Sequence, residues 1–404
     1  MAAGATRAST EVEAHLDTEW LRDLVETLAS IHRPTASQGE RRAAEWLLGR
    51  LRELGAYGRI EVEDVHGTFW WPLGIASGAG VVAGLAALRG ARTLAIALAT
   101  ASAAAIADEV PPRGQRLRKL LPRRRAFNVV ARMGPEDAER TVVLVAHHDA
   151  AHAGLLFHPK IPELADRLGF IERSDTSPPL LAPVIGGPIA VAAGALTGWR
   201  AVTVLGTMLA AGSAATFIDI GCRDAVPGAN DNATGVAVLI AIARALAEQP
   251  AENVRVMLVS TSEEALCEGM RAFAERHFEE LAPERTFFLS IDTVGSPHLL
   301  VLRGEGMMGM HEYPAEGLEL VDGLADELDI ALFPNLRLRN ATDGVFPLRA
   351  GYPCASLCSC TDLKQPGNYH WPTDTPENVD YETVADAVQL TEAVVRRLDE
   401  RWLA

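Results

Sequence analysis

Four long apolar runs, arranged as two pairs, constrain this 404-residue chain more than any other feature. The first pair covers residues 69–88 and 93–107, and the second covers residues 179–198 and 201–218. A membrane-spanning helix needs about 20 mostly apolar residues, and three of the runs reach that length, the run 93–107 being short. Because only a short turn separates the members of a pair, each pair predicts a helical hairpin that returns the chain to its starting side.

The two hairpins are predicted to cross a membrane. Surface helices of globular proteins keep a polar face, which these runs lack, and their many Gly and Ala residues suit close helix packing in lipid. Membrane lipid is therefore an expected partner. The alternative interpretation is a set of long buried helices or an oligomer interface.

The distribution of charge predicts the orientation of these hairpins. Seven Lys and Arg residues lie within residues 113–125, directly after the first hairpin, whereas the hairpin turns hold only Arg89, Arg92 and Arg200. Basic residues concentrate on the cytoplasmic side of membrane proteins. Residues 1–20 lack the apolar segment of a secretory signal, and the five cysteines show no disulfide-framework spacing. We therefore expect a multi-pass protein of a bacterial cytoplasmic membrane, with its soluble domain in the cytoplasm.

Outside the hairpins, apolar strands alternate with amphipathic helices. Strands are predicted over residues 253–260 and 286–291, a helix over 234–249, and a pair of partner strands over 59–65 and 126–133. This order predicts a three-layer α/β/α fold with a mixed, centrally parallel sheet and a site at the carboxyl ends of the strands. The formal charge of −16 has the wrong sign for binding nucleic acid.

The predicted domain organisation is discontinuous. Residues 18–66, 109–174 and 221–402 form the soluble catalytic domain, and residues 67–108 and 175–220 are the inserted hairpins.

Two histidines and an aspartate follow the apolar stretch that begins at Val142. Side chains alternate along a strand, so His147 and Asp149 share one face and His148 points away. A metal-bound histidine usually donates its other ring N–H to a carboxylate. His147 is therefore a candidate ligand, with Asp149 as the residue that orients it.

Further polar residues end other apolar segments. Asp231 lies in a Gly-flanked loop before a helix, where a helix cap formed by Asp231 or Asn232 is the structural alternative. Adjacent Glu263 and Glu264 end a buried strand and would be costly there without a positive charge. Asp292 ends another strand, and His370 lies in a Pro-containing loop. Two histidines and three carboxylates suit two cations such as Zn²⁺, and the remaining glutamate would take a proton from water.

In these segments the chain resembles the co-catalytic di-zinc exopeptidases of peptidase family M28, which include leucine-type aminopeptidases and glutamate carboxypeptidases. The matching segments, in the family's order, are AHHD, GANDNATGVAVLIAIARAL, SEEALCEGMRAF, IDTVG, TDGVFPLRAGYP and YHWPTDTPENVD. The resemblance implies one zinc held by His147 and Asp292, a second held by Glu264 and His370, and Asp231 bridging both. It also implies that Glu263 is the general base and that Asp149 supports His147.

The chain departs from the family pattern in several places. His148 stands where the family often has Tyr or Leu, and the usual Ser-Asp-His segment reads Thr342-Asp343-Gly344. The Gly-Ser that follows the glutamate pair is Gly269-Met270. About twenty residues normally separate the first aspartate from the bridging one, whereas Asp149 and Asp231 are 82 apart in this chain. The second hairpin fills that gap, which would bring the site close to a bilayer surface.

The predicted function is a zinc-dependent aminopeptidase that hydrolyses N-terminal peptide bonds with water activated between two Zn²⁺ ions. A membrane-facing amidohydrolase of N-acyl or lipidic amino acids would use the same chemistry. Glutaminyl cyclisation is a third possibility, and a non-catalytic metal-stabilised receptor is a fourth. The intact ligand set argues against the receptor, because a site that no longer catalyses a reaction should lose Glu263 first.

Overall fold

The central sheet has seven strands in the order β1-β2-β4-β3-β5-β10-β6. Their bounds are β1 (Tyr57–Val65), β2 (Arg124–Met133), β3 (Arg140–His147), β4 (Val254–Thr261), β5 (Thr286–Ile291), β6 (His298–Val301) and β10 (Cys354–Cys360). β3 runs parallel to β4 and β5, and β5 runs parallel to β10, whereas β1, β2 and β6 join in antiparallel pairs. The predicted mixed sheet with a parallel centre is therefore confirmed, as is the pairing of β1 with β2, which is antiparallel.

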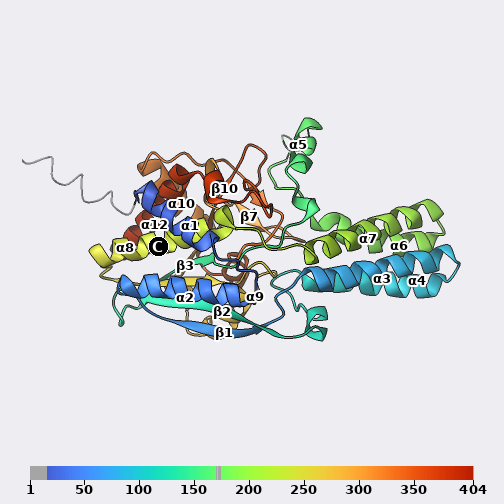
Figure 1. Cartoon of the computed structure of the whole chain (residues 1–404), viewed down its shortest axis with the longest axis horizontal. Coiled ribbons are helices and arrows are strands. Elements are labelled where there is room, and N and C mark those ends of the chain that lie inside the picture. The colour runs from blue at the N-terminus through green and yellow to red at the C-terminus, as the bar shows by residue number, and fades with distance from the viewer. Residues whose placement is uncertain (1–15, 170, 172–173, 404) are drawn as a thin grey trace, which may run out of the picture.

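Helices cover both faces of this sheet (Figure 1). One face packs against α1 (Thr18–Ala29), α2 (Gln38–Glu53), α8 (Thr234–Glu248), α10 (Ala315–Glu327) and α12 (Tyr381–Glu400), and the other against α9 (Glu268–His277) and α11 (Val345–Ala350). Alternate residues of β3 serve the two layers, because Val142 and Leu144 join the first core and Val143 and Val145 the second. These are the three layers that the sequence predicts.

The computed structural model describes residues 16–169, 171 and 174–403. Two predicted regions lie partly outside these residues. They are the N-terminal stretch 1–20, which is predicted to lack a secretory signal, and the segment 109–174, of which three positions are not described. A small sheet of β7 (Gly304–Glu305), β8 (His311–Glu312) and β9 (Arg337–Leu338), and the short helix α5 (Lys160–Arg167), complete the elements of the body.

The four apolar runs form helices that pack into one bundle and project from the body (Figure 1). The helices are α3 (Trp70–Leu88), α4 (Arg92–Glu109), α6 (Leu181–Thr197) and α7 (Arg200–Gly221). α3 packs against α4 and α7, and α6 packs against the same two helices. The two hairpins therefore pack against each other as well as within themselves.

Two of these helices, α3 and α7, are long and apolar enough to cross a membrane, a test that rests on length and composition alone. Within the molecule only 39% of the apolar window of α3 and 28% of that of α7 is buried. The expectation that the run 179–198 also reaches spanning length was wrong. Its helix, α6, has 17 residues, because it begins only after Pro178 and Pro179 and ends where Gly198 adopts a left-handed conformation, with φ 79°.

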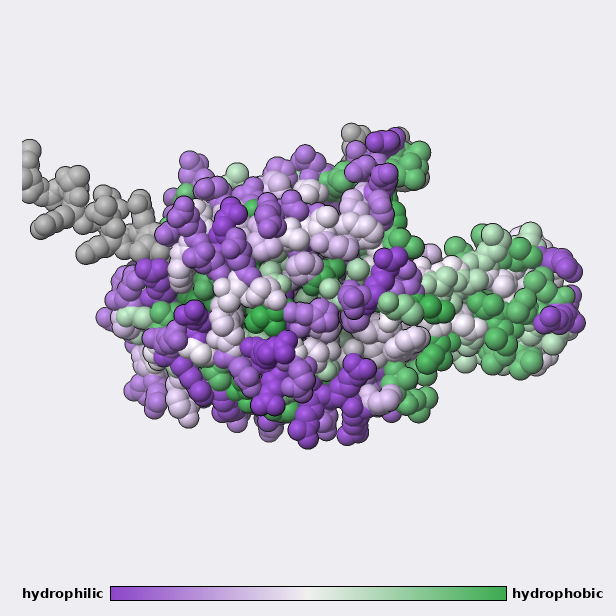
Figure 2. All heavy atoms as spheres, in the orientation of Figure 1, coloured by the Kyte–Doolittle hydropathy of each residue, from purple (hydrophilic) through white to green (hydrophobic). Residues whose placement is uncertain are grey.

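The surface of the bundle is apolar along most of its length, and hydrophilic residues gather at its far tip (Figure 2). Large exposed side chains occur on all four helices; examples are Ile75, Leu94, Ile189 and Leu205, each at least half exposed. Isolated exposed apolar residues are ordinary, but a continuous apolar surface marks a site of contact with lipid or protein.

Buried ion pairs join the base of the bundle to the body. Arg118 Nε lies 2.8 Å from Glu109 Oε2, at the end of α4, and Arg118 Nη1 lies 3.2 Å from Glu268 Oε2, at the start of α9. Six of the seven basic residues within 113–125 are exposed as expected, but Arg118 is buried because it pairs with these two carboxylates.

Glycine at position 206 is expected to be required for contact between α6 and α7. A methyl group there would lie 2.6 Å from the Val191 backbone nitrogen, whereas one at Gly186 meets nothing within 4 Å. Gly206→Ala should lower the free energy of unfolding by about 1–3 kcal/mol, and Gly186→Ala should raise it by about 0.5–1 kcal/mol. Thermal unfolding of both variants in the same detergent measures the difference; equal effects would contradict the packing observed.

Candidate metal centre

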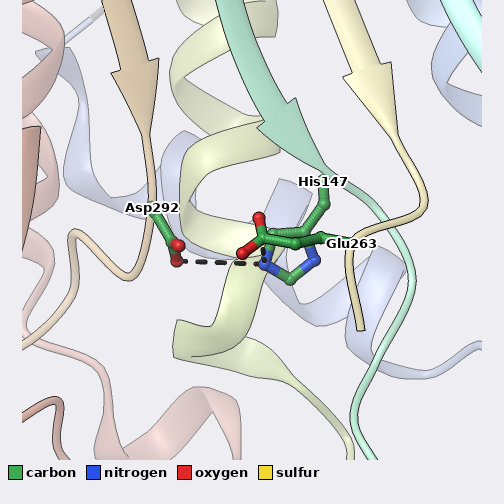
Figure 3. A group of neighbouring side chains, drawn as sticks. All are labelled: His147, Glu263 and Asp292. Atoms are coloured by element: carbon green, nitrogen blue, oxygen red, sulfur yellow. Dashed lines mark ion pairs between the residues drawn. The ribbon is translucent and has the colours of Figure 1, made fainter. Parts of the chain in front are cut away.

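Three neighbouring parallel strands deliver polar side chains to one edge of the sheet (Figure 3). His147 is the last residue of β3, Glu263 lies two residues beyond β4, and Asp292 follows β5 directly. His147 Nε2 is 3.8 Å from Glu263 Oε2 and 3.8 Å from Asp292 Oδ1. The carboxyl ends of parallel strands meet at one edge, which is why residues far apart in sequence converge here.

Asp231 lies between the two histidines. It belongs to the turn η4 (Ala229–Ala233), directly before α8. Its Oδ1 is 3.1 Å from His147 Nε2, and its Oδ2 is 3.2 Å from His370 Nε2. Glu264 Oε2 lies 3.3 Å from the same nitrogen of His370. The structure thus brings together all the residues that the sequence singles out as ligands.

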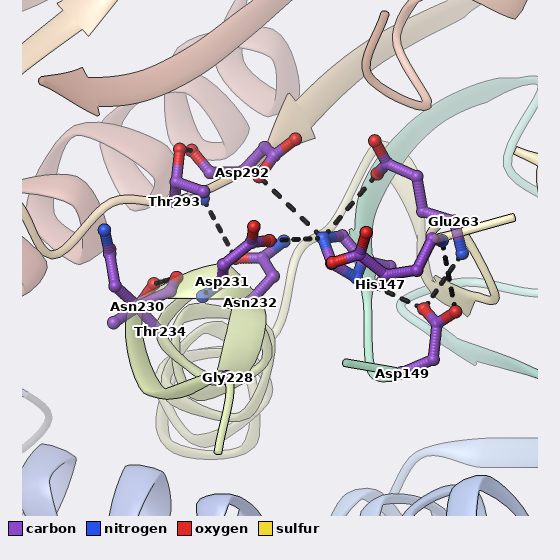
Figure 4. A network of polar contacts seen from close by, with 12 residues as sticks. His147, Asp149, Gly228, Asn230, Asp231, Asn232, Thr234, Glu263, Asp292 and Thr293 are labelled. Atoms are coloured by element: carbon purple, nitrogen blue, oxygen red, sulfur yellow. Dashed lines mark hydrogen bonds and ion pairs between the residues drawn. The ribbon is translucent and has the colours of Figure 1, made fainter. Parts of the chain in front are cut away.

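Ala233 is the N-cap residue of α8, and the side chain of Asn232, not that of Asp231, accepts from the first turn of this helix. The side-chain oxygen of Asn232 accepts hydrogen bonds from the backbone N–H groups of Gly235 (3.0 Å) and Thr293 (3.1 Å). The carboxylate of Asp231 is therefore left to face His147 (Figure 4), and its other oxygen faces His370.

The donor set fits metal ions. The buried oxygens Glu264 Oε1 and Asp292 Oδ1 have no hydrogen-bond donor in the described part of the chain. Burial, together with the neighbouring Asp292 carboxylate, raises the pKa of Glu263 well above its usual range, and burial raises the pKa of Glu264 to about 7. A divalent cation would supply the missing partner and offset the repulsion. Nitrogen and oxygen ligands of this kind suit zinc.

The possible ligand atoms form two groups of three, and within each group all three atoms lie within 4.8 Å of one another. One combines His147, Glu263 and Asp292, and the other combines His147, Asp231 and Glu264. Glu263 therefore stands close enough to the centre to act on whatever the metal ions hold.

Asp149 contacts both His147 and the turn that carries Glu263 and Glu264 (Figure 4). Its Oδ1 lies 3.2 Å from His147 Nδ1 and accepts from the backbone N–H of Glu263 at 2.9 Å. Its Oδ2 accepts from the N–H of Glu264 at 3.1 Å and from Thr35 Oγ1 at 2.5 Å. Burial alone would raise the pKa of Asp149, but these contacts hold it below the usual value. Asp149 thus fixes both the imidazole and the turn that carries the two glutamates.

Arg33 was not singled out by the sequence, although it supports two of the metal-binding loops. The buried guanidinium donates only to backbone carbonyls, those of Leu28 (3.2 Å), His148 (2.8 Å), Pro227 (2.5 Å) and Gly228 (2.6 Å). It thereby joins the end of β3 to the loop that carries Asp231. A single arginine in a polar loop carries no periodic or spacing signal by which it could have been found.

Asp374 holds the backbone of the bridging residue and was also missed. Its carboxylate accepts from the N–H groups of Asn230 (2.8 Å) and Asp231 (3.2 Å), and burial raises its pKa to about 7. It lies four residues after His370 in the quoted segment YHWPTDT, but sequence alone did not separate it from an ordinary turn residue.

The residues that depart from the family pattern lie beside the centre. His148 points away as predicted, with Nδ1 2.9 Å from Ser260 Oγ, and burial lowers its pKa to about 4. Asp343 accepts a hydrogen bond from Thr261 and has a second buried oxygen without a partner in the described residues. Burial raises the pKa of Asp343 to about 7.

The long insertion between Asp149 and Asp231 leaves the site intact because its two ends are hydrogen-bonded to each other. The N–H of Ala153 donates to Asp224 O (3.0 Å), and the N–H of Val226 donates to Ala151 O (2.8 Å). The chain therefore leaves and returns at nearly the same point.

A cavity of about 830 Å³ opens over the centre. His147, Asp231, Glu263, Asp292 and His370 lie at its floor, and its walls are mainly apolar, formed in part by Leu300, Leu302, Leu336 and Leu338. Such a cavity with a few convergent polar groups is the usual form of a small-molecule or peptide site.

The fold and this set of side chains support a zinc-dependent hydrolase. A family model for peptidase family M28 matches residues 214–395. Residues 214–395 therefore match the family that the motifs of the chain resemble. No curated protein matches the chain in sequence.

Several solved structures share the fold. A glutaminyl cyclase from Tannerella forsythia is similar with a TM-score of 0.58 and 16% identity, covering 94% of this chain and 98% of its own. A Zn-dependent exopeptidase from Parabacteroides distasonis has a TM-score of 0.55 and 13% identity, covering 94% of this chain and 98% of its own. A zinc aminopeptidase from Bacillus subtilis has a TM-score of 0.56 and 14% identity, covering 94% of each chain.

Asp374→Asn is expected to weaken metal binding without removing a ligand. The substitution replaces one acceptor oxygen that fixes the backbone of Asp231 with a donor, and loss of such supporting contacts typically costs 10–100-fold in metal affinity. Competition with a zinc chelator measures the affinity. Glu377→Gln, an exposed change three residues away, is the control, and an unchanged affinity in Asp374→Asn would contradict the assigned role.

Proposed function

We propose that the protein is a di-zinc aminopeptidase whose catalytic domain faces the cytoplasm from a bacterial membrane. The observation that carries the enzymatic part is the position of Asp231, each of whose carboxylate oxygens has its own histidine nitrogen. That arrangement supports two ions with a shared carboxylate: His147 and Asp292 would hold one, and Glu264 and His370 the other.

Glu263 is the proposed general base. When bound, the two zinc ions would lower the pKa of a water molecule and polarise the scissile carbonyl group. The Glu263 carboxylate would accept the proton of the attacking water and return it to the nitrogen of the departing amine. The backbone N–H of Glu263 is held by Asp149, so the carboxylate is aimed at the centre from a fixed turn.

Tyr369 is placed to bind the substrate carbonyl oxygen. Its ring stacks on His370 with centroids 3.9 Å apart, and it lines the cavity over the centre. Its hydroxyl accepts a hydrogen bond from Asn340 Nδ2 at 3.0 Å. The hydroxyl hydrogen therefore remains free to be donated into the cavity, where charge develops in the transition state.

Glu263→Gln should reduce kcat by about 10²–10⁴-fold, because amide cannot accept the proton. Zinc content should be unchanged, and Glu279→Gln, on the exposed surface, should leave both quantities as in the wild type. The assay uses aminoacyl-arylamides, their N-acetylated counterparts and an N-terminal glutamine peptide.

The substrates and the zinc content separate the alternatives. Cleavage restricted to free amines supports the aminopeptidase, and cyclisation of the glutamine peptide would replace it with a glutaminyl cyclase. Loss of zinc in Glu263→Gln would make Glu263 a ligand instead of the base.

The dimensions of the bundle support the membrane part of the proposal. The three longer helices, of 18–22 residues, are about 27–33 Å long, close to the ~30 Å thickness of the hydrocarbon core, and α6 is shorter. Arg89, Arg92, Arg200 and the exposed Trp199 lie at the tip, where interfacial side chains are expected. Six exposed basic residues and Leu120, which is 81% exposed, lie on the body side.

Cysteine labelling is expected to place the tip and the body on opposite sides of the membrane. In a Cys222→Ser background, which removes the one exposed cysteine of the described chain, Ala91→Cys should react with an impermeant maleimide in intact cells. Leu120→Cys should react only after the cells are opened. Recovery of the protein in the soluble fraction, or the reverse labelling pattern, would contradict this topology.

A further inference from the structure

A second cavity, of about 1210 Å³, connects the bundle to the metal centre. At one end it is lined by Glu263, Glu264, Tyr369 and His370, which also line the first cavity. The rest of its wall comes from the bundle and the loop beside it. The two cavities share the proposed base and two proposed ligands. A group bound in the second cavity can therefore be part of the same molecule as the substrate at the metal centre.

One face of α7 forms the long wall of this cavity, which we call the bundle groove. Its lining residues follow helical spacing: Met208, Leu209, Gly212, Ser213, Thr216, Phe217 and Ile220. At 1.5 Å per residue this face extends about 18 Å away from the body. Phe69 and Leu73 at the start of α3, and Leu181 and Val184 at the start of α6, form the opposite walls near the body.

Beyond the metal centre, the described lining of the bundle groove has few polar side chains, those of Ser213, Thr216, Cys267 and Asn340. The hydroxyl of Ser213 donates to Leu209 O (2.9 Å), and that of Thr216 donates to Gly212 O (3.0 Å), so both hydrogens are used within α7. A peptide segment would bury backbone N–H and C=O groups there without partners, which is costly. An aliphatic chain buries no such group and gains from the transfer out of water.

The groove opens on the apolar outside of the bundle. Met208, at its far end, is 67% exposed, and Gly212 is also exposed. In the proposed topology this opening faces the hydrocarbon core of the bilayer, so a chain could enter from the membrane without crossing water.

We propose that the bundle groove holds the long aliphatic chain of an amphiphilic substrate whose scissile amide lies at the metal centre. This inference rests on the proposed function, because it names the class of substrate for the same centre. It predicts that the enzyme acts on lipid-like aminoacyl or acylamino compounds in preference to short water-soluble peptides.

Gly212→Phe tests the proposal by filling the groove. A side-chain carbon at Gly212 meets nothing within 4 Å, so the change fits the fold. Gly78→Phe on α3 is the matched control, because Gly78 is equally open but does not line the groove. The substrates are leucine amides of straight-chain amines from butylamine to tetradecylamine, and N-acyl leucines over the same chain lengths. All three proteins are assayed in the same detergent.

With the wild type, kcat/KM should rise about two- to fourfold for each added methylene until the groove is filled, in at least one series. The ratio of wild type to Gly212→Phe should be near one for the shortest chain and at least about tenfold for the longest. The ratio to Gly78→Phe should stay near one throughout. Comparing variants at each chain length cancels the partitioning of long chains into micelles.

Two outcomes separate this inference from the proposed function. If short substrates are cleaved and the Gly212→Phe ratio stays flat in both series, the inference is wrong and the aminopeptidase stands. If nothing is cleaved, equilibrium binding of leucine dodecylamide to the Glu263→Gln protein decides. If Gly212→Phe weakens this binding at least about tenfold, the groove assignment holds although the proposed peptidase activity is wrong. If binding is absent, or is unaffected by Gly212→Phe, the groove assignment is wrong.

Discussion

The burial of several carboxyl groups at one edge of a parallel sheet is the constraint on which the rest of the structure depends. Asp231, Glu263, Glu264 and Asp292 have low exposure and stand close to one another. Like charges in such a site are stable only if something positive compensates them. Two histidines do so in part, and a bound cation would satisfy the buried oxygens that lack a partner among the described residues.

The supporting residues act mainly on backbone groups. Asp149 fixes the N–H groups of the two adjacent glutamates, Asp374 fixes that of Asp231, and Arg33 joins the loops through their carbonyls. Loop geometry is thereby set before any metal binds. This explains how the chain can carry a 46-residue predicted insertion, residues 175–220, beside the centre without disturbing it. The ends of the inserted region are hydrogen-bonded together, so the Asp231 loop starts from a fixed point.

The bundle gives the centre a second wall that the sheet alone does not provide. Its base is tied to the body by the buried pairs of Arg118 with Glu109 and Glu268. α7 carries an apolar face from the outside of the bundle to Glu263 and His370. In the proposed function, α7 would thus join the metal centre at the sheet edge to the apolar surface of the bundle.

The sequence by itself determined the layers of the fold, the strand ends and the candidate ligand residues. These follow from periods of two and about 3.6 and from the cost of burying a charge, which are local properties of the chain. His147 and Asp149 sharing a face, and His148 pointing away, are direct consequences of strand geometry.

Only the tertiary structure decided the contributions of Arg33, Thr35 and Asp374, because they act through partners more than a hundred residues away. It also decided that Arg118 is buried and that α6 falls short of spanning length. The packing of the two hairpins into one bundle, and the groove that this creates beside the centre, depend on contacts between helices that no local pattern encodes.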